Sequence, residues 1–170
     1  MRLPNPVFSI YIRSYEPKDL EACLTCFKTN VPTAFTPEEI GFFEDFLQNR
    51  VSVSPDTLPY FVLVERDSIV GCGGLGLNEN DTVSLTWGLV RQDCQKRGLG
   101  LALLEYRLRK VWELFPGKKL RLDTSQHAAG FFEKHGFQTV GFVPDGYSAG
   151  LHRYDMEWPS KTGVEMLCCP

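Results

Sequence analysis

The residues with the clearest chemical potential are "QKRGLG" at positions 95–100, which stand directly before a helical pattern. The first turn of an α-helix leaves four backbone N–H groups unpaired, and Ser, Thr, Asp or Asn usually caps them. No such residue occurs between Gln95 and Ala102. Instead, Lys96 and Arg97 add positive charge to the positive end of the helix dipole, and two glycines expose the backbone. This combination predicts a binding site for an anion, most simply a phosphate or pyrophosphate.

Two further motifs favour structure over chemistry. "GCGGLG" at residues 71–76 has the G-x-G-x-x-G spacing of dinucleotide-binding loops, but it lies inside a strand pattern and opens no helix. Glycines in such a strand indicate a bulge or a close approach by a neighbouring group. Cys23 and Cys26 form one CxxC pair, and no second pair has zinc-ribbon spacing, because Cys168 and Cys169 are adjacent in the tail. We therefore interpret the cysteines as reduced, packed thiols and expect no metal.

The elements that must position the 95–100 segment follow from hydrophobic periodicity and turn residues. The expected strands are residues 9–15, 59–65, 68–77, 83–90, 118–124, 137–143 and 151–158, and the expected helices are residues 16–30, 35–50, 101–115 and 125–136. Thr36 and Glu39 fit a capping box at the start of the second helix, and "PDGYSAG" at residues 144–150 fits a turn. This order predicts an α/β fold with one central mixed sheet of about seven strands flanked by about four helices.

Length and composition limit the class of protein. The 170 residues suit one domain, which we place at residues 9–158, with a C-terminal tail at 159–170. A hydrophobic content of 43%, a charged content of 23% and a net charge of −3 are typical of an ordinary globular protein and argue against nucleic-acid or membrane-surface binding. No segment has a signal-peptide or membrane-spanning pattern, so we expect a cytoplasmic protein.

Two separated motifs resemble the GNAT N-acetyltransferase superfamily. Gln95, Gly98 and Gly100 match the Q-x-x-G-x-G of that family's acetyl-CoA site, which follows a strand and opens a long helix. "SQHAAGFFEKHGF" at residues 125–137 is similar to the family's later N-x-x-A-x-x-L-Y-E-K-x-G-F motif. The resemblance implies a GNAT-like fold over roughly residues 10–158 and the activity of an acetyl-CoA-dependent N-acetyltransferase.

The resemblance also implies how the cofactor would be held. The backbone of Leu89 and Val90 would pair with the pantetheine amides like an added strand, and amide groups from Gln95 to Leu101 would hold the pyrophosphate. The expected cofactor-binding residues are Leu89, Val90, Gln95, Lys96, Arg97, Gly98, Leu99, Gly100, Leu101, Ser125 and Phe132. The implied partners are acetyl-CoA and an amine acceptor, without nucleic acid or membrane, for a protein that is a monomer or a homodimer.

Three departures from the family pattern affect the chemistry. Phe132 stands where many relatives have a tyrosine that protonates the thiolate, and Ser125 stands where Asn is frequent. The expected strand at residues 83–90 contains no Asp or Glu, so the acidic base that some relatives place there is missing. Acetyl-CoA binding is therefore better supported by the sequence than any particular catalytic residue.

Asp123 and Tyr147 are the replacement candidates for catalysis. Strand alternation puts the Asp123 side chain on the face opposite Leu120 and Leu122, where it could accept a proton or bind a cationic amine. A strand-end Asp that pairs with Arg121 or a local amide is the alternative interpretation. Tyr147 lies in the expected turn and could protonate the thiolate, or its ring could cover the acceptor pocket.

Two hypotheses for the function remain. In the first, a primary amine of a small molecule or a protein attacks the thioester of acetyl-CoA directly in a ternary complex. In the second, the chain is a non-catalytic acyl-CoA-binding or sensing domain on the same fold, which the phenylalanine at position 132 motivates.

Overall fold

A computed structural model describes residues 9–159 of the chain, which divides after Lys118 into two compact units. The described residues contain seven strands and four α-helices in the order β-α-α-β-β-β-α-β-α-β-β, and this confirms the expected α/β fold. No helix among these residues is long and apolar enough to cross a membrane. The expected tail, including Cys168 and Cys169, lies outside the described residues except for Pro159.

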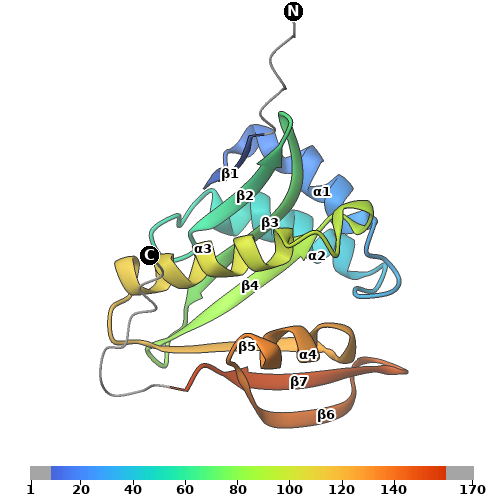
Figure 1. Ribbon diagram of the computed structural model, residues 1–170, viewed down its shortest axis with the longest axis vertical. Helices are drawn as coiled ribbons and strands as arrows, with labels where there is room; N and C mark the ends of the chain where they lie inside the picture. Colours follow the sequence, from blue (N-terminus) through green and yellow to red (C-terminus); the bar gives the residue numbers. More distant parts are fainter. Residues whose placement is uncertain (1–8, 160–170) are drawn as a thin grey trace, which may run out of the picture. The chain divides into compact units, whose positions relative to one another are not determined.

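The first unit is built on four antiparallel strands (Figure 1). They are β1 (Ile10–Ser14), β2 (Tyr60–Glu65), β3 (Ser68–Leu77) and β4 (Thr82–Val90), and each pairs with the next in this order. Every residue of β2 is buried, which explains why its sequence "YFVLVE" is apolar almost throughout.

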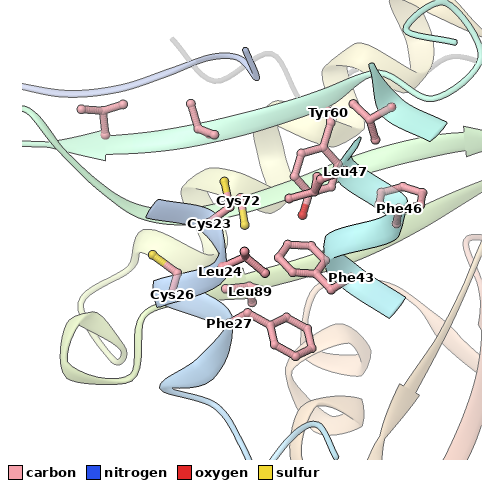
Figure 2. Packing of buried hydrophobic residues seen from close by; sticks show 13 residues of the cluster. Cys23, Leu24, Cys26, Phe27, Phe43, Phe46, Leu47, Tyr60, Cys72 and Leu89 are labelled. Atoms are coloured by element: carbon pink, nitrogen blue, oxygen red, sulfur yellow. The ribbon is translucent and has the colours of Figure 1, made fainter. Parts of the chain in front are cut away.

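Helices cover both faces of these strands (Figure 1). They are α1 (Leu20–Lys28), α2 (Glu39–Asp45) and α3 (Leu99–Leu114), with α3 on the face opposite α1 and α2. Aromatic rings fill the space between α1, α2 and the strands: Phe27 stacks on Phe43 with ring centroids 4.6 Å apart, and Phe43 lies 5.5 Å from the ring of Trp87. Figure 2 shows this core.

The start of the second helix differs from the expectation. The carboxylate of Glu39 accepts the backbone N–H of Thr36 at 2.7 Å, as in a capping box, but Thr36 is not the cap because regular helix begins only at Glu39. After Asp45 the chain continues as a π-helical segment, η2 (Phe46–Val51). The wider π turn places Phe46, Leu47 and Val51 in the core.

Cys23, Cys26, Cys72 and Cys94 are buried free thiols. Cys23 lies beside Cys72 in Figure 2, and this contact together with burial raises the pKa of the Cys23 thiol. Within residues 9–159, no group of three or more His, Cys, Asp or Glu side chains is arranged to hold a metal ion. The burial of these four free thiols agrees with the interpretation as reduced, packed cysteines, although Sγ of Cys26 also donates to the carbonyl of Ile69 at 3.3 Å.

The second unit consists of β5 (Lys119–Ser125), α4 (Gln126–Lys134), β6 (Gln138–Ser148) and β7 (Leu151–Glu157). The strands are antiparallel in the order β5-β7-β6, and α4 packs against them. Within β5, Leu120 and Leu122 are buried and Asp123 is exposed, so the expected alternation is confirmed.

The expected turn at residues 144–150 is wrong. β6 continues to Ser148, and the register jumps from the pair Val143–Arg153 to the pair Ser148–Leu151. Four residues of β6 thus lie opposite the single residue between these partners, and this wide bulge redirects the side chains within it. Asp145 has a φ of +52°, and its carboxylate accepts the N–H of Gly150 at 2.9 Å, which closes the hairpin at Ala149 and Gly150.

Candidate functional site

The segment between β4 and α3 has a backbone conformation that few residue types adopt. After Val90 the chain forms a 3-10 turn, η3 (Gln92–Cys94), and Gln95 is extended. Lys96 then has a φ of +60° and Gly98 a φ of +81°, and α3 begins at Leu99. A Cβ atom at Gly98 would meet no atom within 4 Å. The backbone conformation therefore favours glycine at position 98, while the space beside it is open.

Six consecutive backbone N–H groups, those of residues 96–101, find no acceptor within the part of the chain that the structure describes. Gly98 is the N-cap of α3 and has no side chain to cap it. Successive backbone N–H groups next to left-handed residues point into one concavity that can bind an anion. The dipole of the 16-residue helix α3 adds positive potential there. A phosphate or diphosphate group is chemically suited to this donor set, because its oxygens can accept the N–H groups that the protein leaves unpaired.

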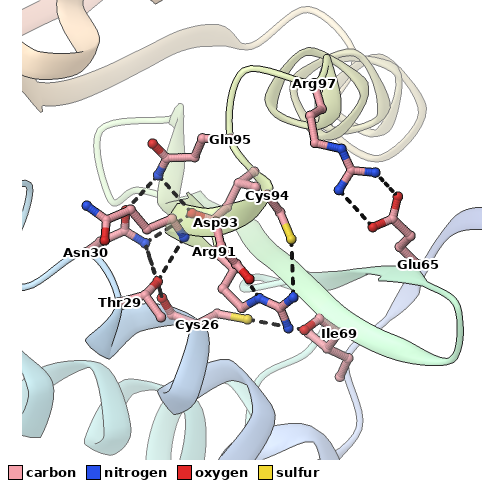
Figure 3. A network of polar contacts seen from close by, with 12 residues as sticks. Cys26, Thr29, Asn30, Glu65, Ile69, Arg91, Asp93, Cys94, Gln95 and Arg97 are labelled. Carbon is pink, nitrogen blue, oxygen red and sulfur yellow. Dashed lines mark hydrogen bonds and ion pairs between the residues drawn. The ribbon is translucent and has the colours of Figure 1, made fainter.

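Gln95 is exposed, but its side-chain amide nitrogen is held by hydrogen bonds within the protein (Figure 3). Its Nε2 donates to Oδ1 of Asn30 at 2.8 Å and to the carbonyl of Val90 at 3.0 Å. Asn30 is buried and donates to the same Val90 carbonyl at 3.1 Å and to the carbonyl of Cys26 at 3.1 Å. Gln95 thus ties the segment to the ends of β4 and α1. The Val90 carbonyl already accepts two hydrogen bonds, so pantetheine pairing there would have to use other backbone groups.

Arg97 is held by an acidic partner (Figure 3). Lys96 is exposed. The guanidinium of Arg97 donates to both carboxylate oxygens of Glu65, at 2.5 and 3.1 Å. These hydrogen bonds lower the pKa of Glu65 and raise the pKa of Arg97, so both groups are charged around neutral pH. Glu65 is buried at the end of β2. Its negative charge offsets the positive charge of Arg97, which the sequence analysis counted toward the anion site.

The bulge that the glycines of "GCGGLG" indicate occurs where β3 pairs with β4, and its extra residue lies in β4. Gly74 pairs with Thr86 and Cys72 with Leu89, so Gly73 lies opposite two residues, Trp87 and Gly88. Trp87 has a φ of +39°, which is a strained conformation for a bulky residue. Its carbonyl accepts the phenol O–H of Tyr60 at 2.8 Å, and its ring packs among the aromatic residues of the core.

Arg107 of α3 fills the opposite side of this bulge. It is 3% exposed, and it donates from Nε and Nη2 to the carbonyl of Gly74 and from Nη2 to the carbonyl of Thr86. A Cβ at Gly73 or Gly88 would lie 3.1 Å or less from this guanidinium. The strand glycines thus permit a close approach, as the sequence analysis expected for "GCGGLG". The position of Arg107 three residues after Leu104 and four before Val111, on the apolar face of the helix, is the sequence signal that could have found it.

The two candidate catalytic residues meet in the second unit. The phenol O–H of Tyr147 donates to Oδ2 of Asp123 at 2.5 Å. Asp123 faces Asp155 across the β5–β7 pair, and Arg153 donates to both oxygens of Asp155. Arg121 pairs instead with Glu157, so the alternative of an Asp123–Arg121 ion pair is not realised. The bulge of β6 brings Tyr147, which is half-buried, to an exposed carboxylate 24 residues away in sequence.

The remaining predicted residues of the second unit lie at α4. Ser125 is buried at the N-cap position and makes no capping hydrogen bond through its side chain. Phe132 is half-buried, and its ring lies edge-on to those of Phe131 and Phe137, at 5.2 and 5.5 Å. Position 132 therefore supplies packing and no proton.

Comparisons with known proteins agree with the motifs. The family model of the acetyltransferase (GNAT) domain matches residues 49–139, more than half of the chain. A search of curated proteins returned no match.

Solved structures share the fold at low identity. An acetyltransferase assigned to the GNAT family from Desulfovibrio desulfuricans is 24% identical, with a TM-score of 0.72 over 88% of this chain and 98% of that one. The ribosomal-protein-S18-alanine N-acetyltransferase of Escherichia coli is 22% identical, with a TM-score of 0.69 over 94% and 99% of the two chains. An aminoglycoside 6'-N-acetyltransferase complexed with coenzyme A is 15% identical, with a TM-score of 0.69 over 90% and 99%.

Replacing Glu65 with Gln is expected to strengthen coenzyme A binding. The variant removes the charge that holds Arg97, and the freed guanidinium can then reach a phosphate oxygen. Calorimetric titration at low salt should show an affinity increase of about threefold to tenfold, the size typical of one exposed charge-assisted contact.

Two controls make this result specific. Glu16→Gln, which removes an exposed ion pair with Lys18 elsewhere in the first unit, should leave the affinity unchanged. The gain should vanish in the double variant Glu65→Gln/Arg97→Gln. An unchanged or weakened affinity in folded Glu65→Gln protein would show instead that the ion pair supports the site rather than competing with it.

Proposed function

Because this chain belongs to the GNAT acetyltransferase family, we propose that it is an acetyl-CoA-dependent N-acetyltransferase that acts on a primary amine. The observation that carries the proposal is the run of six unpaired N–H groups at residues 96–101, beside an open space at Gly98. A globular protein rarely leaves so many adjacent amides without an acceptor unless a ligand or water supplies one. A diphosphate is the part of acetyl-CoA that this donor set suits best.

The residues proposed to hold acetyl-CoA divide by the part of the ligand they would bind. The amides of residues 96–101 would bind the pyrophosphate, with Lys96 adding charge, while Gln95 keeps the segment in shape through Asn30. The backbone of Leu89 and Val90 would bind the pantetheine arm as an added strand, within the limit set by the engaged Val90 carbonyl. Ser125 and Phe132 remain proposed contacts from the family motif.

The bound cofactor would supply an acetyl group activated as a thioester. The protein would position the amine, take up its proton and provide for the charge on the departing sulfur. Asp123 is our candidate for binding a cationic amine or accepting its proton, because it is an exposed carboxylate. Tyr147 remains our candidate for protonating the thiolate, and its hydrogen bond to Asp123 means that the two groups would act as a pair.

The second candidate function is a non-catalytic acyl-CoA-binding or sensing domain. The observation that favours it is Phe132, whose ring packs against its neighbours where many relatives carry a proton donor. The two related structures named for their substrates act on a ribosomal protein and on an aminoglycoside, so relatives of this fold serve both protein and small-molecule amines. The acceptor proposed for this chain accordingly stays at the level of a primary amine.

The function is tested by thiol release from acetyl-CoA with a panel of amines and a free-thiol reagent. We expect amine-dependent release, and a saturating ligand at 100 times its Kd should stabilise the fold by about 2.7 kcal/mol, which is several degrees in Tm. Stabilisation without amine-dependent release would establish the binding or sensing function instead.

Gly98→Asp, with Gly98→Asn as its neutral control of equal size, tests the anion site in the same assays. Both side chains enter open space and tolerate the left-handed backbone. The aspartate should lose most of the Tm shift and turnover through charge repulsion, whereas the asparagine should keep a measurable part of both. Equal behaviour of the two variants would contradict an anion at this position.

Tyr147→Phe tests the proton donor, because it keeps the ring and removes only the hydroxyl. Turnover should fall by a factor of about 10² to 10⁴, the usual contribution of a general acid or base, while acetyl-CoA binding is unchanged. Tyr154→Phe on β7, whose ring contacts Phe142, is the matched control and should keep its activity. A fall of less than about threefold would remove Tyr147 from the mechanism, and a loss of acceptor affinity alone would make it a pocket residue.

A further inference from the structure

Arg107 is a buried cation without a counter-charge. Among residues 9–159 it has no ion-pair partner, and its only hydrogen-bond acceptors are the neutral carbonyls of Gly74 and Thr86. Burial lowers the pKa of Arg107 to about 10, so the guanidinium is still protonated at neutral pH. A buried charge is costly unless it is paired, and a purely structural role would be served as well by a neutral donor.

One end of this guanidinium is unused. Nε and Nη2 make the three hydrogen bonds, while Nη1 has no acceptor among the described residues. The only fully buried side-chain nitrogen or oxygen without a partner in this part of the chain is Oγ1 of Thr86, so Nη1 keeps access to solvent. Two N–H donors on a fixed cation are thus available to an outside group.

Glycine at position 88 leaves room for Nη1 of Arg107. A Cβ atom there would lie 2.3 Å from Nη1, so any side chain would displace the end of the guanidinium. Gly88 itself is exposed, and it directly precedes Leu89 in β4. The cation therefore lies behind an exposed stretch of strand backbone that carries no side chain.

The contacts proposed for acetyl-CoA, taken in order along the ligand, bring its thioester end to Gly88. The proposed pyrophosphate site follows β4, and the pantetheine arm would run back along the strand past Val90 and Leu89. The next residue in that direction is Gly88. We propose that the Arg107 guanidinium, through Nη1 at Gly88, stabilises the negative charge on the sulfur of coenzyme A. This inference rests on the proposed acetyl-CoA site and adds a charge-stabilising residue that neither motif contains.

The role follows from the balance of the transfer. The amine lone pair forms the new C–N bond, and the C–S electron pair leaves on sulfur as a thiolate. The amine proton passes to a base or to water, and Arg107 keeps its own proton throughout. A fixed cation beside the sulfur lowers the basicity of the leaving group, which partly offsets the proton donor that is missing at position 132.

The test is the thiol pKa of bound coenzyme A, read from thiolate ultraviolet absorbance and compared with free coenzyme A. An opposite charge within contact distance should lower it by about one to three units. Arg107→Met should return it to the free value. Gly88→Ala, which keeps the cation but displaces Nη1, should remove most of the shift and also lower kcat, with coenzyme A affinity at acidic pH, where the thiol is protonated, unchanged within about threefold. Gly76→Ala in β3, whose Cβ would meet only Thr86 and Leu58 side chains, is the control and should keep the full shift.

The outcomes separate this inference from the proposed function. Coenzyme A that binds wild-type protein without a change in thiol pKa overturns the role of Arg107 and leaves the binding site intact. A shift that persists in Gly88→Ala overturns it as well, even if Arg107→Met does not fold. Absence of coenzyme A binding to wild-type protein would overturn the proposed function and this inference together.

Discussion

The unpaired amides of residues 96–101 are the constraint on which the first unit depends, because a folded chain must keep them in place without satisfying them. Hydrogen bonds from nearby side chains, rather than a helix cap, hold the backbone of this segment in place. Gln95 and Asn30 both donate to the Val90 carbonyl, and Asn30 also joins the end of α1. The segment is thereby fixed while its donors stay open, which is the arrangement expected of a preorganised anion site.

A second constraint concerns volume at β3 and β4. The guanidinium of Arg107 fits against the strands only because Gly73 and Gly88 lack side chains. On the other face, Trp87 adopts a positive φ and anchors the bulge in the aromatic core through its ring and through Tyr60. The strain at Trp87 and the buried charge at Arg107 occur at one bulge, and such clustering of unfavourable features is typical of functional positions.

Local patterns in the sequence predicted the α/β order, the exposed glycine backbone before the long helix and the structural use of "GCGGLG". They failed where a distant partner decides the outcome. The amide of Gln95 is held by Asn30, 65 residues earlier, and the guanidinium of Arg97 is held by Glu65 of β2. Tyr147 was placed in a turn because its neighbours are turn-forming, but cross-strand pairing with β7 extends β6 through them. The candidate pair Asp123–Tyr147 was chosen residue by residue, and only the fold shows that the two side chains meet.

Backbone amide hydrogen exchange at residues 96–101, with and without saturating coenzyme A, tests the central claim most directly. The account predicts that these six amides, which lack a protein acceptor, become strongly protected when the ligand binds. It also predicts that the buried strand β2 changes little beyond the general gain in stability. Unchanged exchange at residues 96–101 in the presence of bound coenzyme A would contradict it.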